Sequence, residues 1–397
     1  MFKKYIALLL VLSLVFLSAC GQKSEQSDTP KEEEKTPLDS VDSVVPAEPV
    51  DLGIPTGEWY SYNLLARCVW DMTIYDNKLY VGCGDYTNNT GGVPVMYCSL
   101  DDWGNWQREG IVLDEQIGRF LMLDDKLTIP GWDPKDVPET GTYYQLEDGK
   151  WQTHDGLPDG WHNFDLVRYD GKLFAGIGAN KGETPIVVSE NGTDFERVPM
   201  YRNGVPVDTS EGECIRTYNL WVLNDTLYAD FYYENMVENK SYLEVYRYEN
   251  GSFVWCCGLG KKLNMAGIGS VNLSKPWADA VVDDTLFITV GRLYKTTDMV
   301  MFTEIPLPNN AWVYDIYTYN DTMYLLAAYQ KEDGTYSVTV YSSATANFDD
   351  FKVEYTLDSE VQPTSFAVSD DGYFVSFGDW NSMVNTQNGT VIYYPKK

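Results

Sequence analysis

The sequence predicts an all-β chain that folds as one seven-bladed β-propeller of four-stranded antiparallel blades. Three observations lead to this prediction: many aromatic residues and glycines, a hairpin motif that occurs seven times, and a spacing between the copies that suits one blade. The 30 Tyr, 12 Trp, 15 Phe and 32 Gly are typical of short strands joined by turns. A length of 397 residues would alone suggest two or three domains, whereas the repeats favour a single one.

The chain is strongly acidic, with 59 Asp and Glu against 29 Lys and Arg and a formal net charge of −30. Because a phosphate backbone is held by clustered basic side chains, this charge excludes ordinary nucleic-acid binding. Hydrophobic residues make up 44% of the chain, which is enough for a large core.

The first twenty residues have the features of an export signal. Lys3 and Lys4 precede an apolar run at 5–17, which is too short to span a bilayer as a stable helix. The following Leu17-Ser18-Ala19-Cys20 resembles the lipobox of bacterial lipoproteins. The resemblance implies a signal peptide at 1–19, acylation of Cys20, and anchoring at the extracytoplasmic face of the cell membrane. The alternative is a simple secretory signal with a chance cysteine.

Residues 20–58 are expected to form a disordered acidic linker, and residues 59–397 the propeller. The linker is rich in Glu, Lys, Ser, Thr and Pro and has no aromatic residue before Trp59, so it cannot build a core.

The repeated unit is an alternating strand, two turn residues, and a second strand that begins with an apolar and an aromatic residue. The copies are YDNKLY (75–80), LDDKLT (123–128), YDGKLF (169–174), LNDTLY (223–228), VDDTLF (282–287), YNDTMY (319–324) and SDDGYF (369–374). Asp, Asn and Gly tolerate the positive φ of a type I′ turn, which matches the twist of paired strands. The turns begin between residues 76 and 370, about 49 residues apart, a period typical of propeller blades.

The third copy shows all four expected strands, at 164–170, 172–178, 185–191 and 194–200. The last copy, from Pro363, is expected to hold all four of its own strands and to end in TVIYYP. Whether the segment at 59–64 pairs with it to close the ring is left open.

Two turns between third and fourth strands carry a further motif. Ser189-Glu190-Asn191-Gly192-Thr193-Asp194-Phe195 and the segment Ser99 to Trp106 resemble degenerate Asp-boxes of sialidase-like propellers. In that family the box is structural, because its Asp or Asn accepts backbone N–H bonds and its aromatic ring packs between strands. The resemblance therefore implies the architecture and gives these residues no catalytic role.

Candidate ligand-binding residues lie where the first strand of each blade begins, since these positions gather around one mouth of the central channel. They are Arg67, Trp70, Arg119, Trp161, His162, Asn163, Arg216, Tyr218, Trp277, Trp312 and Tyr314. Indole faces suit sugar rings, and Arg suits carboxylates or sulfates. The alternative, favoured for any one of the aromatic residues, is packing between inner strands. Loop residues that could rim the same face are Tyr86, Trp132, Tyr232 and Trp380.

These features favour, over an enzyme, a surface-anchored recognition module that binds a glycan, a cell-wall polymer or a protein partner at the channel mouth. A glycan-degrading hydrolase or lyase is the first alternative, and a structural or assembly protein the second. If the protein were a sialidase, its active site would consist of Arg67, Arg216 and Arg292 with Tyr314, Glu213 and Asp71. Arg67-Cys68-Val69 departs from the Arg-Ile-Pro signature of that family, and seven repeats depart from its six blades.

No cofactor and no metal site is predicted. The chain has only two histidines, His154 and His162, and no CxxC or zinc-type spacing. His162 is favoured as a structural residue. Six cysteines besides Cys20 are expected to be mostly buried free thiols.

Overall fold

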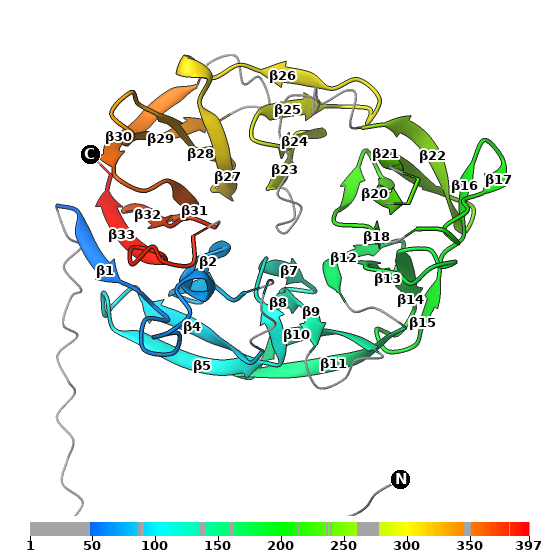
Figure 1. Ribbon diagram of the computed structural model, residues 1–397, viewed down its shortest axis with the longest axis horizontal. Helices are drawn as coiled ribbons and strands as arrows, with labels where there is room; N and C mark the ends of the chain where they lie inside the picture. The colour runs from blue at the N-terminus through cyan, green and yellow to red at the C-terminus, as the bar shows by residue number, and fades with distance from the viewer. Residues whose placement is uncertain are drawn as a thin grey trace, which may run out of the picture. The chain divides into compact units, whose positions relative to one another are not determined.

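A computed structural model describes most of the chain from Glu48 to Lys396. The described residues are 48–85, 87, 91–134, 140–158, 162–212, 214–235, 237–238, 240–259, 278–344, 351–380 and 382–396. They contain no α-helix and two short 3₁₀-helices, η1 (Leu65–Arg67) and η3 (Pro308–Asn310). The strands form sheets arranged around a central opening, as Figure 1 shows, so the chain is an all-β propeller.

Six of the sheets have four antiparallel strands each. The first holds β2 (Asp71–Tyr75), β3 (Lys78–Gly82), β4 (Val93–Ser99) and β5 (Trp106–Val112). The second holds β7 (Leu121–Leu123), β8 (Lys126–Pro130), β10 (Thr140–Glu147) and β11 (Lys150–Pro158). The third holds β12 (Asn163–Tyr169), β13 (Lys172–Ile177), β14 (Ile186–Ser189) and β15 (Phe195–Arg197).

The other three are built from the C-terminal half of the chain, with one added N-terminal strand. One holds β23 (Asp279–Val282), β24 (Thr285–Thr289), β25 (Leu293–Thr296) and β26 (Thr303–Ile305). The next holds β27 (Trp312–Tyr319), β28 (Thr322–Gln330), β29 (Tyr336–Ser343) and β30 (Lys352–Ser359). The last holds β31 (Pro363–Val368), β32 (Gly372–Phe377), β33 (Thr390–Pro395) and β1 (Val50–Gly53).

The fourth repeat builds a larger sheet of seven strands. Its members are β16 (Met200–Arg202), β17 (Val205–Pro206), β18 (Cys214–Arg216), β19 (Leu220–Leu223), β20 (Thr226–Asn235), β21 (Lys240–Glu249) and β22 (Ser252–Gly258). The hairpin β16–β17 joins through a parallel pairing of β16 with β22, and β18 and β19 both pair with β20. The prediction of seven four-stranded blades is therefore wrong as stated, because the described residues form six four-stranded sheets and the fourth repeat forms a larger one.

The N-terminal strand β1 completes the last sheet. Val50 and Asp51 pair with Tyr393 and Ile392 of β33, and the Trp106 indole donates to the Leu52 carbonyl (Nε1 to O, 2.6 Å). The expectation that the last repeat holds all four of its strands is wrong, since its C-terminal segment supplies three. The expected linker at 20–58 is also wrong at its C-terminal end, because 50–53 form a strand.

The predicted hairpin turns form as expected in six of the seven repeats. Both turn residues have positive φ, from Asp76-Asn77 (48° and 57°) to Asn320-Asp321 (48° and 55°). The seventh repeat differs, because neither Asp370 nor Asp371 has a positive φ. A hydrogen bond from the Ser369 backbone N–H to the Gly372 carbonyl (2.9 Å) closes this turn.

The Asp-box-like turn of the third sheet has the structural role that the resemblance implies. Asn191 Oδ1 accepts hydrogen bonds from the backbone N–H groups of Thr193 and Asp194 (both 2.9 Å), and Ser189 Oγ accepts one from Gly192 (2.9 Å). Asp298 does the same for Val300 and Met301 in the sheet β23–β26.

Neighbouring sheets bury their apolar faces against each other. Val81 of β3, Leu326 of β28 and Phe374 of β32 belong to one buried cluster, although they come from three different sheets. Each sheet therefore depends on its neighbours for a core. Among the described residues, no helix is long and apolar enough to cross a membrane.

Candidate functional site

The starts of the first strands lie at one face of the ring, which we call the mouth face. Because the strands of each sheet alternate in direction, the loops between second and third strands lie there too. Backbone hydrogen bonds join neighbouring sheets at this face: from Asp85 N to Glu115 O (2.9 Å), from Asn163 N to Gly131 O (2.7 Å) and from Ala179 N to Ile215 O (2.8 Å). The side chains near these bonds are thus held by rigid backbone.

Polar residues occupy one equivalent position in most of the inner strands, five residues before each turn. This channel column consists of Asp71, Arg119, Asp165, Asn219, Ala278, Asp315 and Ser365. Three of its aspartates share one arrangement. One oxygen accepts the backbone N–H of the next residue, and the other accepts a backbone N–H of the following sheet: Phe120 for Asp71 (2.6 Å), Leu220 for Asp165 (2.7 Å) and Phe366 for Asp315 (3.2 Å).

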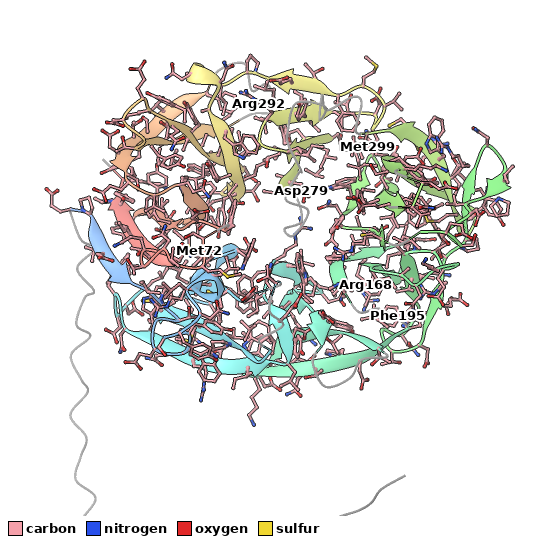
Figure 2. The ribbon with its side chains drawn as sticks, viewed as in Figure 1. Met72, Arg168, Phe195, Asp279, Arg292 and Met299 are labelled. Atoms are coloured by element: carbon pink, nitrogen blue, oxygen red, sulfur yellow. The ribbon has the colours of Figure 1, made fainter. Side chains whose placement is uncertain are left out.

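Arg119 connects three sheets across the channel. Its guanidinium pairs with Asp165 (3.1 Å) and Asp279 (2.8 Å) and donates to Asn219 Oδ1 (3.2 Å). Figure 2 shows Asp279 at the inner edge of its sheet, beside the central opening. Burial raises the pKa of Asp279 to about 6, against the lowering effect of Arg119. A cavity of about 420 Å³ extends along the channel between β2, β7, β23 and β27.

A second group of ionisable residues lies at the mouth face. Glu115 is in β6 (Asp114–Gln116), which pairs with β9 (Trp132–Pro134), the strand that holds Asp133. An isolated β-bridge between Trp132 and His162 connects His162 to the strand β9. One potential ligand atom of each of Glu115, Asp133 and His162 lies within 4.8 Å of the others. We call these three residues the mouth cluster.

The ionisable groups of the mouth cluster have pKa values that are shifted from their ordinary ranges. Burial, and then the charges of Asp133, Asp85 and Asp114, raise the pKa of Glu115 to about 9. Burial also raises the pKa of Asp133. Burial and the charge of Arg216 lower the pKa of His162 to about 3. Shifted ionisable groups that gather at a cleft are a feature of functional sites.

The guanidinium of Arg216 lies near this cluster and over aromatic rings. Its guanidinium lies 5.6 Å from the centre of the Phe164 ring and donates to the Tyr218 hydroxyl (3.0 Å). With His162, Asn180 and Cys214 it lines a cavity of about 210 Å³.

Aromatic rings form a separate feature of the mouth face. Trp380 stacks on Trp70 (centroids 5.7 Å apart, planes 9° apart) and lies 6.1 Å from Tyr314. Trp70 is fully buried and its indole donates to the Gly84 carbonyl, whereas Trp380 and Tyr314 remain half-buried. We call Trp380 and Tyr314 the aromatic platform.

The predicted binding residues differ in how much of their surface is exposed. Trp70, Asn163 and Tyr218 are at most 3% exposed, so the prediction that they contact a ligand is wrong and the packing alternative holds for them. Arg119 lies in the channel column with its aspartates. Arg67 donates to the carbonyls of Tyr60 (2.9 Å) and Gly57 (3.2 Å).

His162, Arg216, Tyr314 and Trp312 keep accessible surface, and Trp312 is 41% exposed. Trp161, Trp277 and Cys20 lie outside the described residues. Arg67, Arg119 and Arg216 have separate partners within the protein, and their convergence on one ligand stays a prediction.

Three residues that the sialidase alternative requires have partners within the protein. Arg67 and Arg292 donate to backbone carbonyls, the latter to Asn310 (2.9 Å), and Asp71 is engaged in the contact between sheets. Glu213 lies outside the described residues. The six cysteines from Cys68 to Cys257 are free thiols.

Sequence reasoning missed Glu115, Asp133 and the channel column. Alignment of the repeats on their turns would have revealed the column, because its residues share one offset. No local pattern distinguishes Glu115 and Asp133 from the other acidic residues of the chain.

No protein-family model matches the chain, and no curated protein matches it. Among solved structures, it is similar to a chain of the mitotic checkpoint complex (9% identity, TM-score 0.47, 93% of this chain and 99% of that chain). It is also similar to PorZ, a surface component of the type-IX secretion system of Porphyromonas gingivalis (11% identity, TM-score 0.47, 82% of this chain and 46% of that chain). A third similar structure is the polysaccharide lyase Uly1 (9% identity, TM-score 0.43, 89% and 98%). These likenesses concern the fold, which supports many functions.

Proposed function

We propose that the protein is a lipid-anchored recognition module that binds a glycan or cell-wall polymer at the mouth face of its propeller. The observation that carries the proposal is the aromatic platform. Half-buried Trp380 is held flat by the fully buried Trp70 beneath it, with Tyr314 beside it. Rigid, partly exposed aromatic rings offer an apolar face for the C–H groups of a sugar ring at little cost in conformational entropy.

A glycan without acidic groups fits this face better than an anionic one. The chain carries a net charge of −30, and the three arginines that could offset it locally are engaged with partners inside the protein. Arg216 lines a cavity at this face, and its charge acts on the nearby carboxyl groups of Glu115 and Asp133. Carboxyl groups form hydrogen bonds with sugar hydroxyls, so these residues would support a neutral ligand, whereas the net negative charge of the chain would repel an anionic one.

The binding test is retention on an array of neutral and acidic glycans, followed by affinity measurement with the best-retained glycan. Trp380→Ala is expected to weaken binding at least about tenfold, and Trp380→Phe to restore most of it, since a ring still covers Trp70. Trp255→Ala is the matched control, because Trp255 lies in the strand β22 under Arg202. Equal affinity of the Trp380→Ala variant and the parent, with both folded, would contradict the proposal.

A glycan hydrolase or lyase remains the second candidate, and the mouth cluster favours it. Two carboxyl groups with raised pKa values beside a neutral imidazole could exchange protons with a substrate. New reducing ends or unsaturated sugars released from the retained glycan, and lost in Glu115→Gln, would establish catalysis in place of simple binding.

The anchor is proposed from the sequence of the first twenty residues. A chain expressed in bacteria is expected to incorporate labelled palmitate and to partition into a detergent phase, and Cys20→Ser is expected to do neither. Labelling of the Cys20→Ser chain would place the lipid elsewhere and refute acylation at Cys20.

We also propose that the seven-stranded sheet acts as the seventh blade of the ring. Its strands β19 to β22 pair consecutively and antiparallel, as in a regular blade, and they contain the fourth of the seven predicted turns. An experimental density map with six sectors around the axis would contradict this.

A further inference from the structure

The mouth cluster has the composition of a metal site. It brings two carboxyl groups and one imidazole together from three segments, with one ligand atom of each within 4.8 Å of the others. The backbone positions are fixed, since Glu115 and Asp133 lie at the centres of the paired strands β6 and β9 and His162 is bridged to Trp132. The cluster is therefore built by the fold and is not a chance meeting of long surface side chains.

Two of its three members have polar atoms without the partners that buried polar groups normally have. Glu115 is only 3% exposed, and its carboxyl group forms no hydrogen bond or ion pair with any residue that the structure describes. His162 Nδ1 is buried and has no hydrogen-bond partner within the same part of the chain. A buried polar group without a partner costs about 1–3 kcal/mol, which indicates that something else satisfies these atoms.

Arg216 does not serve as the missing partner. Its guanidinium donates to the Tyr218 hydroxyl and lies over the rings of Phe164 and Tyr218. Within the described residues, no ion pair joins Arg216 to Glu115 or Asp133. Two carboxyl groups thus lie close together at the mouth face without a cation in contact with them.

We propose that Glu115, Asp133 and His162 bind one divalent ion of the first transition row, such as Zn²⁺ or Mn²⁺. One imidazole nitrogen with two carboxylate oxygens suits these ions, whereas Ca²⁺ and Mg²⁺ favour sites made of oxygen alone. Ligand atoms around such an ion are about 3.5 Å apart, so the three side chains must close in slightly, which rotation about the side-chain torsions of Glu115 and Asp133 allows.

Three protein ligands leave at least one coordination position open. Asp133 and His162 are partly exposed at the mouth face, so the open position is accessible to water or to a hydroxyl group of a ligand. The site is independent of the aromatic platform and of any glycan.

The test uses the folded propeller after dialysis against EDTA, with no glycan present. Titration calorimetry with Zn²⁺ is expected to show one site with a Kd of about 10 μM or tighter, and Mn²⁺ to give an electron paramagnetic resonance signal of bound ion. Glu115→Gln, Asp133→Asn and His162→Ala should each weaken Zn²⁺ binding at least about tenfold. The matched control His154→Ala removes the other histidine, which stacks on Tyr143 away from the cluster, and should bind as the parent does.

Two results would overturn the proposal: a parent that binds neither ion below about 100 μM, or a His154→Ala variant that loses as much affinity as His162→Ala. Circular dichroism separates loss of the site from loss of the fold, and Glu115→Gln keeps nearly the shape of the native side chain. Failure of the glycan test leaves this result unaffected, because the metal titration contains no glycan.

Discussion

Replacing Arg119 with methionine is expected to lower the free energy of unfolding by about 3–5 kcal/mol. The guanidinium contacts Asp165 and Asp279 of two different sheets and Asn219, which directly precedes β19 of a third, and the Arg119 side chain is only 13% exposed. Its loss leaves two carboxylates in the channel without their counter-charge. Removing one partner of a buried ion pair costs far more than the pair itself contributes, because the remaining charge stays desolvated.

The effect is expected to depend on pH in a way that lost packing would not. Without Arg119, the pKa values of Asp165 and Asp279, which burial already raises, rise further above their values in the unfolded chain. The folded variant then binds more protons than the unfolded chain does, so its stability is greatest at low pH and is lost as the pH rises through the folded pKa values. The destabilisation should therefore be larger at pH 8 than at pH 5.

Urea unfolding followed by tryptophan fluorescence at both pH values measures this prediction. Arg168→Met is the matched control, because Arg168 pairs with Asp124 of a hairpin turn and both side chains are at least 36% exposed. An exposed pair of this kind contributes about 0–1 kcal/mol. An Arg119→Met variant that is as stable as Arg168→Met, or that loses the same free energy at pH 5 and pH 8, would refute the role assigned to Arg119.

Arg119 also illustrates how much of the molecule can be predicted from its sequence. Its position near the start of an inner strand is evident from the repeats, because Asp and Asn pairs at the turns are local signals of a positive φ. Its partners are not evident, since Asp165 and Asp279 are 46 and 160 residues away and meet it only when the ring has formed. The mouth cluster cannot be predicted from the sequence for the same reason, because Glu115 and Asp133 come together only when β6 pairs with β9.

The solvent exposure of the aromatic residues cannot be predicted from the sequence. Trp70 and Trp380 both lie at the mouth face, and only packing determines that Trp70 is covered while Trp380 keeps accessible surface. A tryptophan in an inner strand and one in a loop have the same chemistry, so composition alone cannot separate a structural ring from one that faces solvent. The strand β1 was missed for a related reason: Val50–Gly53 is short, carries no turn signal, and pairs with residues about 340 positions away.

Removal of β1 is expected to have the second large effect. A chain that begins at Ile54 loses the pairing with β33, the burial of Leu52 (4% exposed) and the carbonyl that accepts the Trp106 indole N–H. Burial of a leucine contributes about 2 kcal/mol and each hydrogen bond about 1 kcal/mol, so the free energy of unfolding should fall by about 4–6 kcal/mol. The midpoint of thermal unfolding should drop by roughly 10 °C.

The matched control is a chain that begins at Glu48, which keeps β1 and lacks everything before it. It should melt within about 2 °C of the full chain, since no described contact of the propeller is removed. Without β1, strand β33 becomes an exposed edge, and the shorter chain should also associate at high concentration. Adding a peptide of residues 48–58 should restore part of the lost stability, because the peptide can occupy the vacant edge of β33. If the two truncated chains melt at the same temperature, or if the peptide has no effect on the shorter one, β1 does not close the ring as the pairing with β33 implies.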